Sequence, residues 1–469
     1  MNIAIIGGGI TGLSALYELE KHRSESGSDI DVQLYEKSSA LGGKIETMHR
    51  DGFTIERGPD SFLARKPELL SLVEDLGLSD QLVTNNTGQA FIVSEGQFHP
   101  IPPGSVMGIP TKAKPFLASS LLSSKGKMRA TADLWLPAKQ NEHDDESLGL
   151  FFRQRFGDEL VDRILEPLLS GIYAGDIDEL SLASTFPHFR DEKRSLILAS
   201  RATAKKRQAK SGTGQQGGVF RTVKGGLSVV VDELEKAVPE GTIHREKHLQ
   251  EIVSAAENGY RLFFADGTEA EADQVILTIP QEAAAATLPS LSVQEEMIST
   301  AAGASTATVA IALKESALES TVEGTGFLIP NGNDVALKAV TLVHKKWPQM
   351  VPEGYALLRC FVGRPGHDAI VAETDEAIVA QTLRELRTFL DIQEEPLFTS
   401  VTRWPEAMPK YTVGHQARIE KWTAALAREY PGVQLAGAFY RGIGLPDCVR
   451  QGQEAAIQTT EFRDQRSDA

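Results

Sequence analysis

Apolar residues run without interruption from Ile3 to Ile6 at the start of the chain. An unbroken apolar run of this length is typical of a strand buried on both faces of a parallel sheet. After it, Leu13, Leu16 and Tyr17 recur at helical spacing among good helix formers. The pattern therefore predicts a buried strand, a short turn and a helix, in that order.

Similar patterns predict elements along the rest of the chain. An Asp-Gly pair at 266–267 lies between two apolar runs, which favours a hairpin over residues 258–280. Strands and helices alternate along much of the sequence, which is typical of an α/β fold. The other expected elements are strands at Val32–Glu36, Phe53–Ile55 and Val433–Ala436, a helical stretch at 148–169, and helices at Ser228–Ala237 and Pro446–Thr460.

The segment from Phe91 to Ala138 is rich in Pro and Gly and mixes apolar residues with cations. It is compatible with short amphipathic helices, and one interpretation is a patch that lies on a membrane surface. A helical lobe with a solvated basic face is the favoured interpretation. The cations that would form that face are Lys112, Lys114, Lys125, Lys127 and Arg129.

The first predicted turn is Gly7-Gly8-Gly9-Ile10-Thr11-Gly12, which fits the pattern G-x-G-x-x-G. Such a turn needs Gly7 for its tight bend, Gly9 for the approach of a pyrophosphate, and Gly12 for close packing of helix and strand. Free N–H groups at the helix start then face the phosphates. The motif alone is a weak signal for a dinucleotide site, but two further features support it.

The first feature is Glu36, which ends the second predicted strand 24 residues after Gly12, where a ribose partner is expected. The second is Gly42-Gly43-Lys44 directly after that strand. A Gly-Gly-Arg/Lys triplet at this place resembles FAD enzymes of the glutathione-reductase type and is not needed by a nicotinamide fold. FAD is therefore favoured over NAD, and the alternative is a surface Glu beside an ordinary Gly-rich loop.

The composition restricts the classes of partner. The 469 residues suggest two or three domains, and 41% of them are hydrophobic, as in a globular protein. The net charge of −16 disfavours nucleic acid and anionic membranes as partners. Two cysteines, Cys360 and Cys448, form no CxxC, and the start of the chain lacks the pattern of a signal peptide. These features favour a cytoplasmic protein, and no metal-site motif such as HExxH occurs.

A loop with possible ligand contacts follows the Phe53–Ile55 strand. Gly58 and Pro59 break regular structure there, and a Gly in such a loop often marks close approach to a ligand. Arg65 and Lys66 come directly after it. Two cations beside a cofactor loop suit an anionic substrate, although ordinary solvated charges are the alternative.

The motifs GGGITG, Glu36, GGK, VILTIP and GAFYRGIGLPD occur in the order typical of the FAD-containing amine-oxidase superfamily, which the chain resembles. The stretches ERGPDSFLARK at 56–66 and EPLLSGIYAGD at 166–176 resemble the protoporphyrinogen oxidases. The resemblance covers essentially the whole chain, and it points in particular to the enzymes of Gram-positive bacteria that act on coproporphyrinogen III.

The resemblance implies an FAD-binding Rossmann-like domain built from 1–62, 215–282 and 405–469. It also implies a mixed-sheet substrate domain from 63–84 and 283–404, and an inserted helical lobe at 85–214 that is membrane-binding in relatives. Here we expect at most weak membrane contact, at the inner face of the membrane.

The implied reaction is the oxidation of coproporphyrinogen III to coproporphyrin III in three two-electron steps, with O2 reoxidising the flavin to give peroxide. Protoporphyrinogen IX is the alternative substrate, and a non-catalytic FAD-fold binding protein is a second alternative. A transient contact with the next enzyme of haem synthesis is also expected.

The resemblance also implies site residues. The carbonyl of Gly171 would accept from pyrrole N–H groups, Leu328 would pack on the macrocycle, and either Arg65 or Lys66 would hold a propionate. The helix after Gly444 would direct its N-terminus at the flavin pyrimidine. The cofactor contacts would be Gly7, Gly8, Gly9, Ile10, Thr11, Gly12, Glu36, Lys37, Gly43, Lys44, Gly58, Pro59, Asp60, Ser61, Leu249, Trp404, Ile443, Gly444 and Leu445. For Leu249 and Trp404, plain core packing is an equal alternative.

Overall fold

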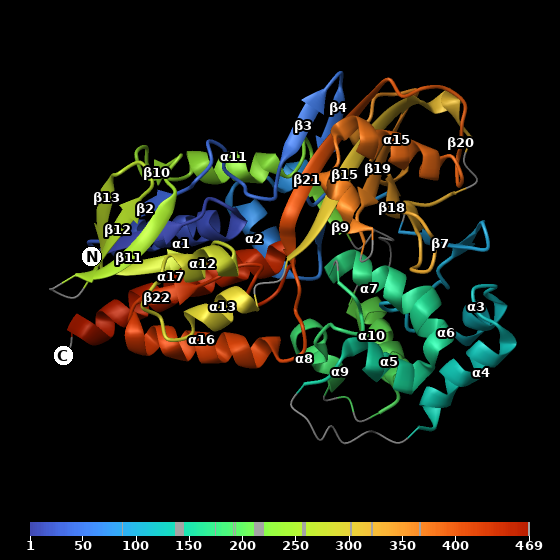
Figure 1. Cartoon of the computed structure of the whole chain (residues 1–469), viewed down its shortest axis with the longest axis horizontal. Helices are drawn as coiled ribbons and strands as arrows, with labels where there is room; N and C mark the ends of the chain where they lie inside the picture. The colour runs from blue at the N-terminus through green and yellow to red at the C-terminus, as the bar shows by residue number, and fades with distance from the viewer. Residues whose placement is uncertain are drawn as a thin grey trace.

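The computed structural model describes residues 1–469 except 87, 137–144, 174, 191, 193, 211–219, 256–258, 301–302, 320–321, 365–366 and 468–469. Figure 1 shows three groups of elements: a sheet flanked by helices on the left, a second sheet at the upper right, and a group of short helices below that second sheet. Both ends of the chain lie at the left, beside the first sheet. The arrangement is an α/β fold, as predicted.

The first sheet is parallel and is assembled from remote parts of the sequence. Its strand order is β10 (Ile243–His244), β2 (Asp31–Tyr35), β1 (Asn2–Ile6), β14 (Gln274–Leu277) and β22 (Val433–Leu435). Ile3 and Ile5 pack into one hydrophobic core and Ala4 and Ile6 into another. Burial on both faces explains why this strand is apolar at every position.

Helices cover both faces of this parallel sheet. The core on one face includes α1 (Ile10–Ser26), α11 (Ser228–Lys236) and α17 (Leu445–Ser467). The core on the other face includes α12 (Gln281–Ala286), α13 (Gln294–Ser299) and α16 (His415–Glu429). Thus α1 and α17, from opposite ends of the sequence, pack against each other.

The hairpin expected over 258–280 is wrong in its second half. β12 (Gly259–Phe264) pairs across the Asp-Gly turn with β13 (Glu269–Ala272), and β11 (Leu249–Ala255) completes this three-stranded sheet. The apolar run that follows is β14, which leaves the hairpin and joins the parallel sheet. All four residues of β14 are buried, which suits a strand covered on both faces.

The second sheet is mixed and has seven strands. Their order is β21 (Phe398–Pro409), β15 (Gly303–Lys314), β19 (Tyr355–Val362), β18 (Leu337–Leu342), β17 (Gly326–Leu328), β7 (Ala90–Ser94) and β8 (Gln97–Pro100). All neighbours are antiparallel except β17 and β7, which are parallel. One face packs on α15 (Asp375–Leu386) through a core of aliphatic side chains.

The predicted start of the helical lobe at residue 85 is wrong, because β7 and β8 belong to the mixed sheet. Ile92 of β7 packs into the core of the helical region, and the next residue, Val93, packs into the core of the sheet. The helical region therefore begins after Pro100. Its helices are α3 (Ala113–Ala118), α4 (Ser124–Thr131), α5 (Leu148–Phe156), α6 (Asp158–Leu160), the π-helix Val161–Leu165, α7 (Glu166–Tyr173), α8 (Leu182–Thr185), α9 (Pro187–Arg190) and α10 (Leu196–Lys210). The other predicted domain boundaries stay predictions.

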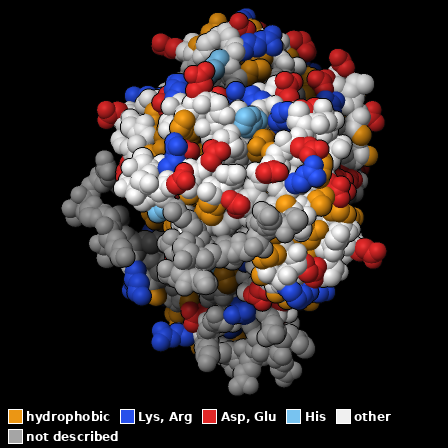
Figure 2. Space-filling view, turned by 90° about the vertical axis from the view of Figure 1, so that its left-hand side faces the viewer, with side chains coloured by type: hydrophobic (Ala, Val, Ile, Leu, Met, Phe, Trp, Pro, Cys, Tyr) orange, Lys and Arg blue, Asp and Glu red, His pale blue; other side chains and the backbone are white. Residues whose placement is uncertain are grey.

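Short elements connect these parts. They are β3 (Thr47–Arg50), β4 (Phe53–Glu56), β5 (Phe62–Leu63), α2 (Pro67–Asp75), β6 (Leu82–Thr84), β9 (Phe220–Val223), β16 (Leu318–Glu319), α14 (Val343–Lys346) and β20 (Asp391–Ile392). Among the described residues, no helix combines the length and apolar character needed to cross a bilayer. Figure 2 shows acidic and basic side chains scattered over the end of the molecule that it faces, rather than gathered into a patch of one sign.

The contact of α17 with α1 gives a test of this packing. A Cβ added at Gly452 of α17 would lie 2.3 Å from the carbonyl oxygen of Thr11. We expect Gly452→Ala to lower the free energy of unfolding by about 1–3 kcal/mol in urea titrations, because the core is overpacked. At an exposed helix position the same change is stabilising by roughly 0.5–1 kcal/mol. Gln453→Ala, one residue along, is the control and should stay within about 0.5 kcal/mol of wild type.

Candidate functional site

The glycine turn after β1 has the close approaches that its motif requires. Gly7 has a φ of +108°, and a Cβ there would lie 2.7 Å from Oγ1 of Thr278. A Cβ at Gly12 would lie 2.0 Å from the carbonyl oxygen of Gly7. At Gly9, in contrast, a Cβ would meet no heavy atom within 4 Å. The turn is thus closely packed at Gly7 and Gly12 and has free space at Gly9, which fits a phosphate-bearing ligand.

Glu36 lies beside this turn, directly after β2. Its carboxylate accepts hydrogen bonds from the backbone N–H of Gly8 at 2.6 Å and from that of Ser38 at 2.8 Å. The side chain is only 9% exposed. A carboxylate has about four acceptor positions, so hydroxyl groups of a ribose can still bind. The neighbouring Lys37 is exposed.

The second glycine loop packs on the first. Gly42 donates its N–H to the carbonyl of Gly8 at 2.8 Å, and a Cβ at Gly43 would lie 3.3 Å from Cα of Gly9. The ammonium of Lys44 donates to the carbonyl of Ala407, and burial lowers its pKa to about 8. The loop that follows β2 therefore forms one wall beside the open side of the glycine turn.

The loop that carries Gly58, Pro59, Asp60 and Ser61 packs on this wall. A Cβ at Gly58 would lie 1.7 Å from the carbonyl oxygen of Lys44, and Trp404 donates its indole N–H to the carbonyl of Arg57 at 3.1 Å. The structure thus brings Trp404, Lys44 and the predicted cofactor loop together.

Two cations from the mixed-sheet side fix this loop. Arg359 donates to the carbonyl of Gly58, and Lys346 donates to Asp60 at 2.7 Å. Burial opposes ionisation of Asp60, but Lys346 and Arg359 outweigh it and hold the pKa of this carboxyl well below its usual range. Sequence reasoning missed both cations, although a single Arg inside the apolar strand YALLRCFV was a usable signal for Arg359.

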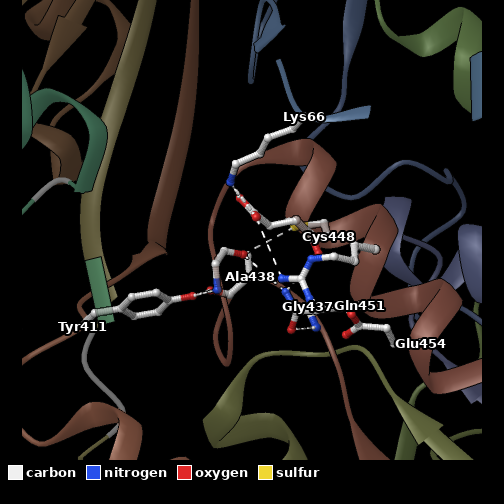
Figure 3. A network of polar contacts seen from close by, with 10 residues as sticks. Lys66, Tyr411, Gly437, Ala438, Cys448, Gln451 and Glu454 are labelled. Carbon is white, nitrogen blue, oxygen red and sulfur yellow. Dashed lines mark hydrogen bonds and ion pairs between the residues drawn. The ribbon is translucent and has the colours of Figure 1, made fainter. Parts of the chain in front are cut away.

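The C-terminal loop that carries Ile443 and Gly444 is held by side chains from two directions. Tyr411 donates its O–H to the carbonyl of Ala438 at 2.6 Å and accepts the N–H of Gly442 at 2.7 Å. Gln451 accepts the N–H of Gly437 at 3.1 Å (Figure 3). Both contacts fix the backbone that leads into Leu445, where α17 begins.

Lys66 is tied to the start of α17. Its ammonium lies 2.6 and 2.5 Å from the two carboxylate oxygens of Asp447 (Figure 3). The Lys66 side chain keeps 37% of its exposure, so it can also meet a ligand. Arg65, the alternative propionate partner, is exposed. The choice between the two stays a prediction.

The last turn of α7 lies near this ion pair. Gly171 is exposed, and a Cβ there would meet nothing within 4 Å. Ile172 is 42% exposed. Burial, with a smaller contribution from the nearby Asp447 carboxylate, raises the pKa of the Tyr173 phenol to about 12, and Arg65 opposes this shift. We call these three residues, with Lys66 and Asp447, the α7–Lys66 region.

Two further predicted residues pack against hydrophobic cores. Leu328 ends β17 and packs, half-buried, against the core of the helical region. Leu249 is 5% exposed and packs in the core between the parallel sheet and the three-stranded sheet. Its surroundings favour plain core packing over a cofactor contact. Ala174, inside the YAGD motif, lies outside the described residues.

The geometry can be compared with known proteins. A profile for flavin-containing amine oxidoreductases matches residues 10–458. The chain belongs to this family. As a flavin-dependent oxidoreductase, it takes its redox chemistry from the cofactor, and its side chains bind and orient.

Several relatives span the whole chain. The coproporphyrinogen III oxidase of Bacillus subtilis is 45% identical and that of Staphylococcus aureus 39%, over 98% and 97% of this chain and 98% of each relative. A crystal structure from Exiguobacterium sp. 255-15, of a protein proposed to be a protoporphyrinogen oxidase, has a TM-score of 0.85 and 37% identity over 97% of this chain and 98% of that one. These findings confirm the predicted family and fold, whereas the individual site residues stay predictions.

Glu36 gives a direct test of the cofactor site in this flavoprotein. Glu36→Ala removes an acceptor of charge-assisted hydrogen bonds, each worth about 1.5–3 kcal/mol. We therefore expect flavin affinity, measured by fluorescence titration, to fall at least about tenfold. Asp31→Ala removes a carboxylate from the exposed end of the same strand and should retain its flavin. Unchanged affinity in Glu36→Ala would show that this residue is not a cofactor contact.

Glu56 makes the stability of the flavoprotein depend on pH. It accepts from the N–H of Leu227 at 2.6 Å and from the hydroxyl of Thr47 at 2.8 Å. Burial nevertheless raises its pKa from 4.5 to about 7. Between these values the unfolded chain releases the proton while the folded chain keeps it, so folding loses stability as pH rises.

We compare wild type with Glu56→Gln, in which this position cannot ionise. As pH rises from 4.5 to 7, we expect the unfolding free energy of wild type to fall by up to about 3 kcal/mol relative to that of the variant. Urea titrations across this range measure it. If the two unfolding free energies differed by the same amount at every pH, the pKa of Glu56 would be its ordinary one.

Proposed function

We propose that this flavoprotein binds FAD and oxidises coproporphyrinogen III to coproporphyrin III with O2, in three two-electron steps that each yield hydrogen peroxide. The observation that carries this proposal is the α7–Lys66 region. It combines the exposed Gly171, exposed apolar surface and a cation, next to the segment that leads into α17. A porphyrinogen offers the complementary groups: pyrrole N–H donors, an apolar macrocycle and propionates.

Three features support FAD as the flavin. The glycine turn is open at Gly9, Glu36 lies at the end of β2, and the Gly42–Lys44 loop packs beside both. Glycine turn and ribose carboxylate suit a dinucleotide, because the turn binds a pyrophosphate and the carboxylate binds the adenosine ribose. When bound, the flavin accepts the electrons of each oxidation step and O2 takes them up.

The side chains of this flavoprotein bind and orient the substrate. The carbonyl of Gly171 accepts from pyrrole N–H groups, and Leu328 packs on the macrocycle. Lys66 neutralises a propionate while Asp447 holds its ammonium in place. The N-terminus of α17 would direct its partial positive charge at the flavin pyrimidine and would stabilise negative charge there.

Charge supports the substrate with four propionates over protoporphyrinogen IX, which has two. A protein of net charge −16 repels a tetra-anion unless cations are gathered locally. Arg65 and Lys66 supply such cations, and Arg441 directly precedes Gly442 in the loop before α17. The full-length bacterial relatives named as coproporphyrinogen III oxidases add support, whereas a chloroplastic protoporphyrinogen oxidase of Oryza sativa is 28% identical. We further propose a cytoplasmic enzyme with at most weak membrane contact, because anionic lipids repel its net charge.

Kinetics on both substrates test the proposal. We expect kcat/KM to be higher for coproporphyrinogen III than for protoporphyrinogen IX, with the gap narrowing as salt screens the charges. Lys66→Met should lower kcat/KM for coproporphyrinogen III by about tenfold, mainly through KM, since the contact binds the substrate uniformly. The measurements are porphyrin fluorescence and peroxide release in air.

Lys21→Met is the matched control, because Lys21 pairs with Asp75 at 3.0 Å on the surface of α1. It should leave both parameters unchanged. Equal or faster turnover of protoporphyrinogen IX would make that substrate the correct one. No oxidation of either porphyrinogen by flavin-loaded protein would leave the binding-protein alternative.

A further inference from the structure

Helix α7 is hydrogen-bonded at one end to the segment that joins β17 and β18 and at the other end to β18 itself. At its N-terminal end, Glu166 accepts a hydrogen bond from the side-chain amide of Asn331 at 2.6 Å. At its C-terminal end, the ammonium of Lys338 on β18 donates to the carbonyl of Ser170 at 2.5 Å. The two contacts span the helix that carries Gly171.

The Lys338 contact lies where a helix needs a hydrogen-bond donor. The last four carbonyls of a helix have no partner within the helix, and in α7 these belong to Ser170, Gly171, Ile172 and Tyr173. A Lys at this end satisfies a free carbonyl and interacts favourably with the helix dipole. Lys338 takes the carbonyl of Ser170, and the carbonyl of Gly171 is the next one along.

The segment that leads into β18, and so to Lys338, is held by further hydrogen bonds. Arg364 donates to the carbonyls of Ile329 at 3.2 Å, Pro330 at 3.1 Å and Leu337. Glu385 accepts the N–H of Leu337 at 2.8 Å. The segment between β17 and β18 is therefore also held by Arg364 and by Glu385 of α15.

Lys338 also links the two predicted substrate contacts. Ala339, its neighbour on β18, lies opposite Leu328 of β17 in the sheet register. The Lys338 contact thus joins the end of α7 that carries Gly171 to the strand beside Leu328.

Burial of the Lys338 ammonium is costly. Burial lowers its pKa to about 8; Glu166 opposes this shift and Arg364 adds to it. A cation retained in such a place beside one carbonyl is poorly explained by packing alone.

We propose that Lys338 is a positioning residue for the substrate: it fixes the Ser170–Gly171 peptide at the end of α7 and thereby the orientation of the Gly171 carbonyl. Glu166 and Asn331 fix the other end of the helix. The identity of the substrate rests on the proposed function, but the contact between Lys338 and α7 does not.

The test compares three variants of the full-length, flavin-loaded protein. Lys338→Met removes the donor and keeps a similar length, whereas Lys338→Arg restores a cationic donor. Lys345→Met is the matched control, since the ammonium of Lys345 also donates to a backbone carbonyl, that of Val322 at 2.5 Å, rather than to α7. Flavin content and thermal unfolding show that each variant is folded.

Two measurements then decide whether Lys338 positions α7 for the substrate. Amide hydrogen exchange of the peptide covering α7, without any substrate, should be about tenfold faster in Lys338→Met and unchanged in Lys345→Met, because one charge-assisted hydrogen bond is lost. The kcat/KM for coproporphyrinogen III and the affinity for coproporphyrin III should fall by a similar factor in Lys338→Met. Both should return toward wild type in Lys338→Arg.

Three results would overturn the proposal. The first is unchanged hydrogen exchange of α7 in Lys338→Met, and the second is faster exchange with unchanged kcat/KM. The third is a loss of kcat/KM in Lys345→Met as large as that in Lys338→Met. Wild-type protein that neither binds nor oxidises a porphyrinogen overturns the proposed function instead. In that case the exchange data still decide whether Lys338 holds α7.

Discussion

Close approach of backbone to backbone at positions without a Cβ is the constraint on which the cofactor side of this flavoprotein depends. Gly12 packs on the carbonyl of Gly7, Gly58 on that of Lys44, and Gly452 on that of Thr11. Each contact joins segments that are held at a distance where no side chain fits. The open front of the glycine turn at Gly9 exists because the rest of the turn is filled in this way.

The cofactor side was predictable from sequence because its signals are local. The apolar run of β1, the glycine turn and the spacing to Glu36 each lie within a few dozen residues, and the structure brings them together. The hairpin prediction failed where the chain continues into β14, because a short apolar run does not reveal which sheet it joins. Likewise, β7 pairs with β17, more than 200 residues away, and no local pattern reports such a pairing.

The substrate side was harder to predict, because its polar contacts join remote segments. Lys338 and Glu166 reach between the helical region and the mixed sheet, and Arg359 and Lys346 reach from that sheet to the loop at Gly58. Such residues appear in the sequence as isolated charges without spacing rules. The family resemblance supplied Gly171 and Leu328, but it did not supply the residues that hold their elements in place.

The parallel sheet begins at residue 2 and receives its last strand, β22, at residues 433–435, and α17 follows it onto α1. During synthesis at about 5–20 residues per second, the N-terminal strand and helix therefore wait on the order of a minute for their final neighbours. For that time the apolar face of α1 lacks its partner α17, and β14, which is made later, lacks its neighbour β22 for the shorter interval between residues 277 and 433. The glycine turn is made early and the loop before α17 late, so we expect flavin uptake to follow the synthesis of that loop.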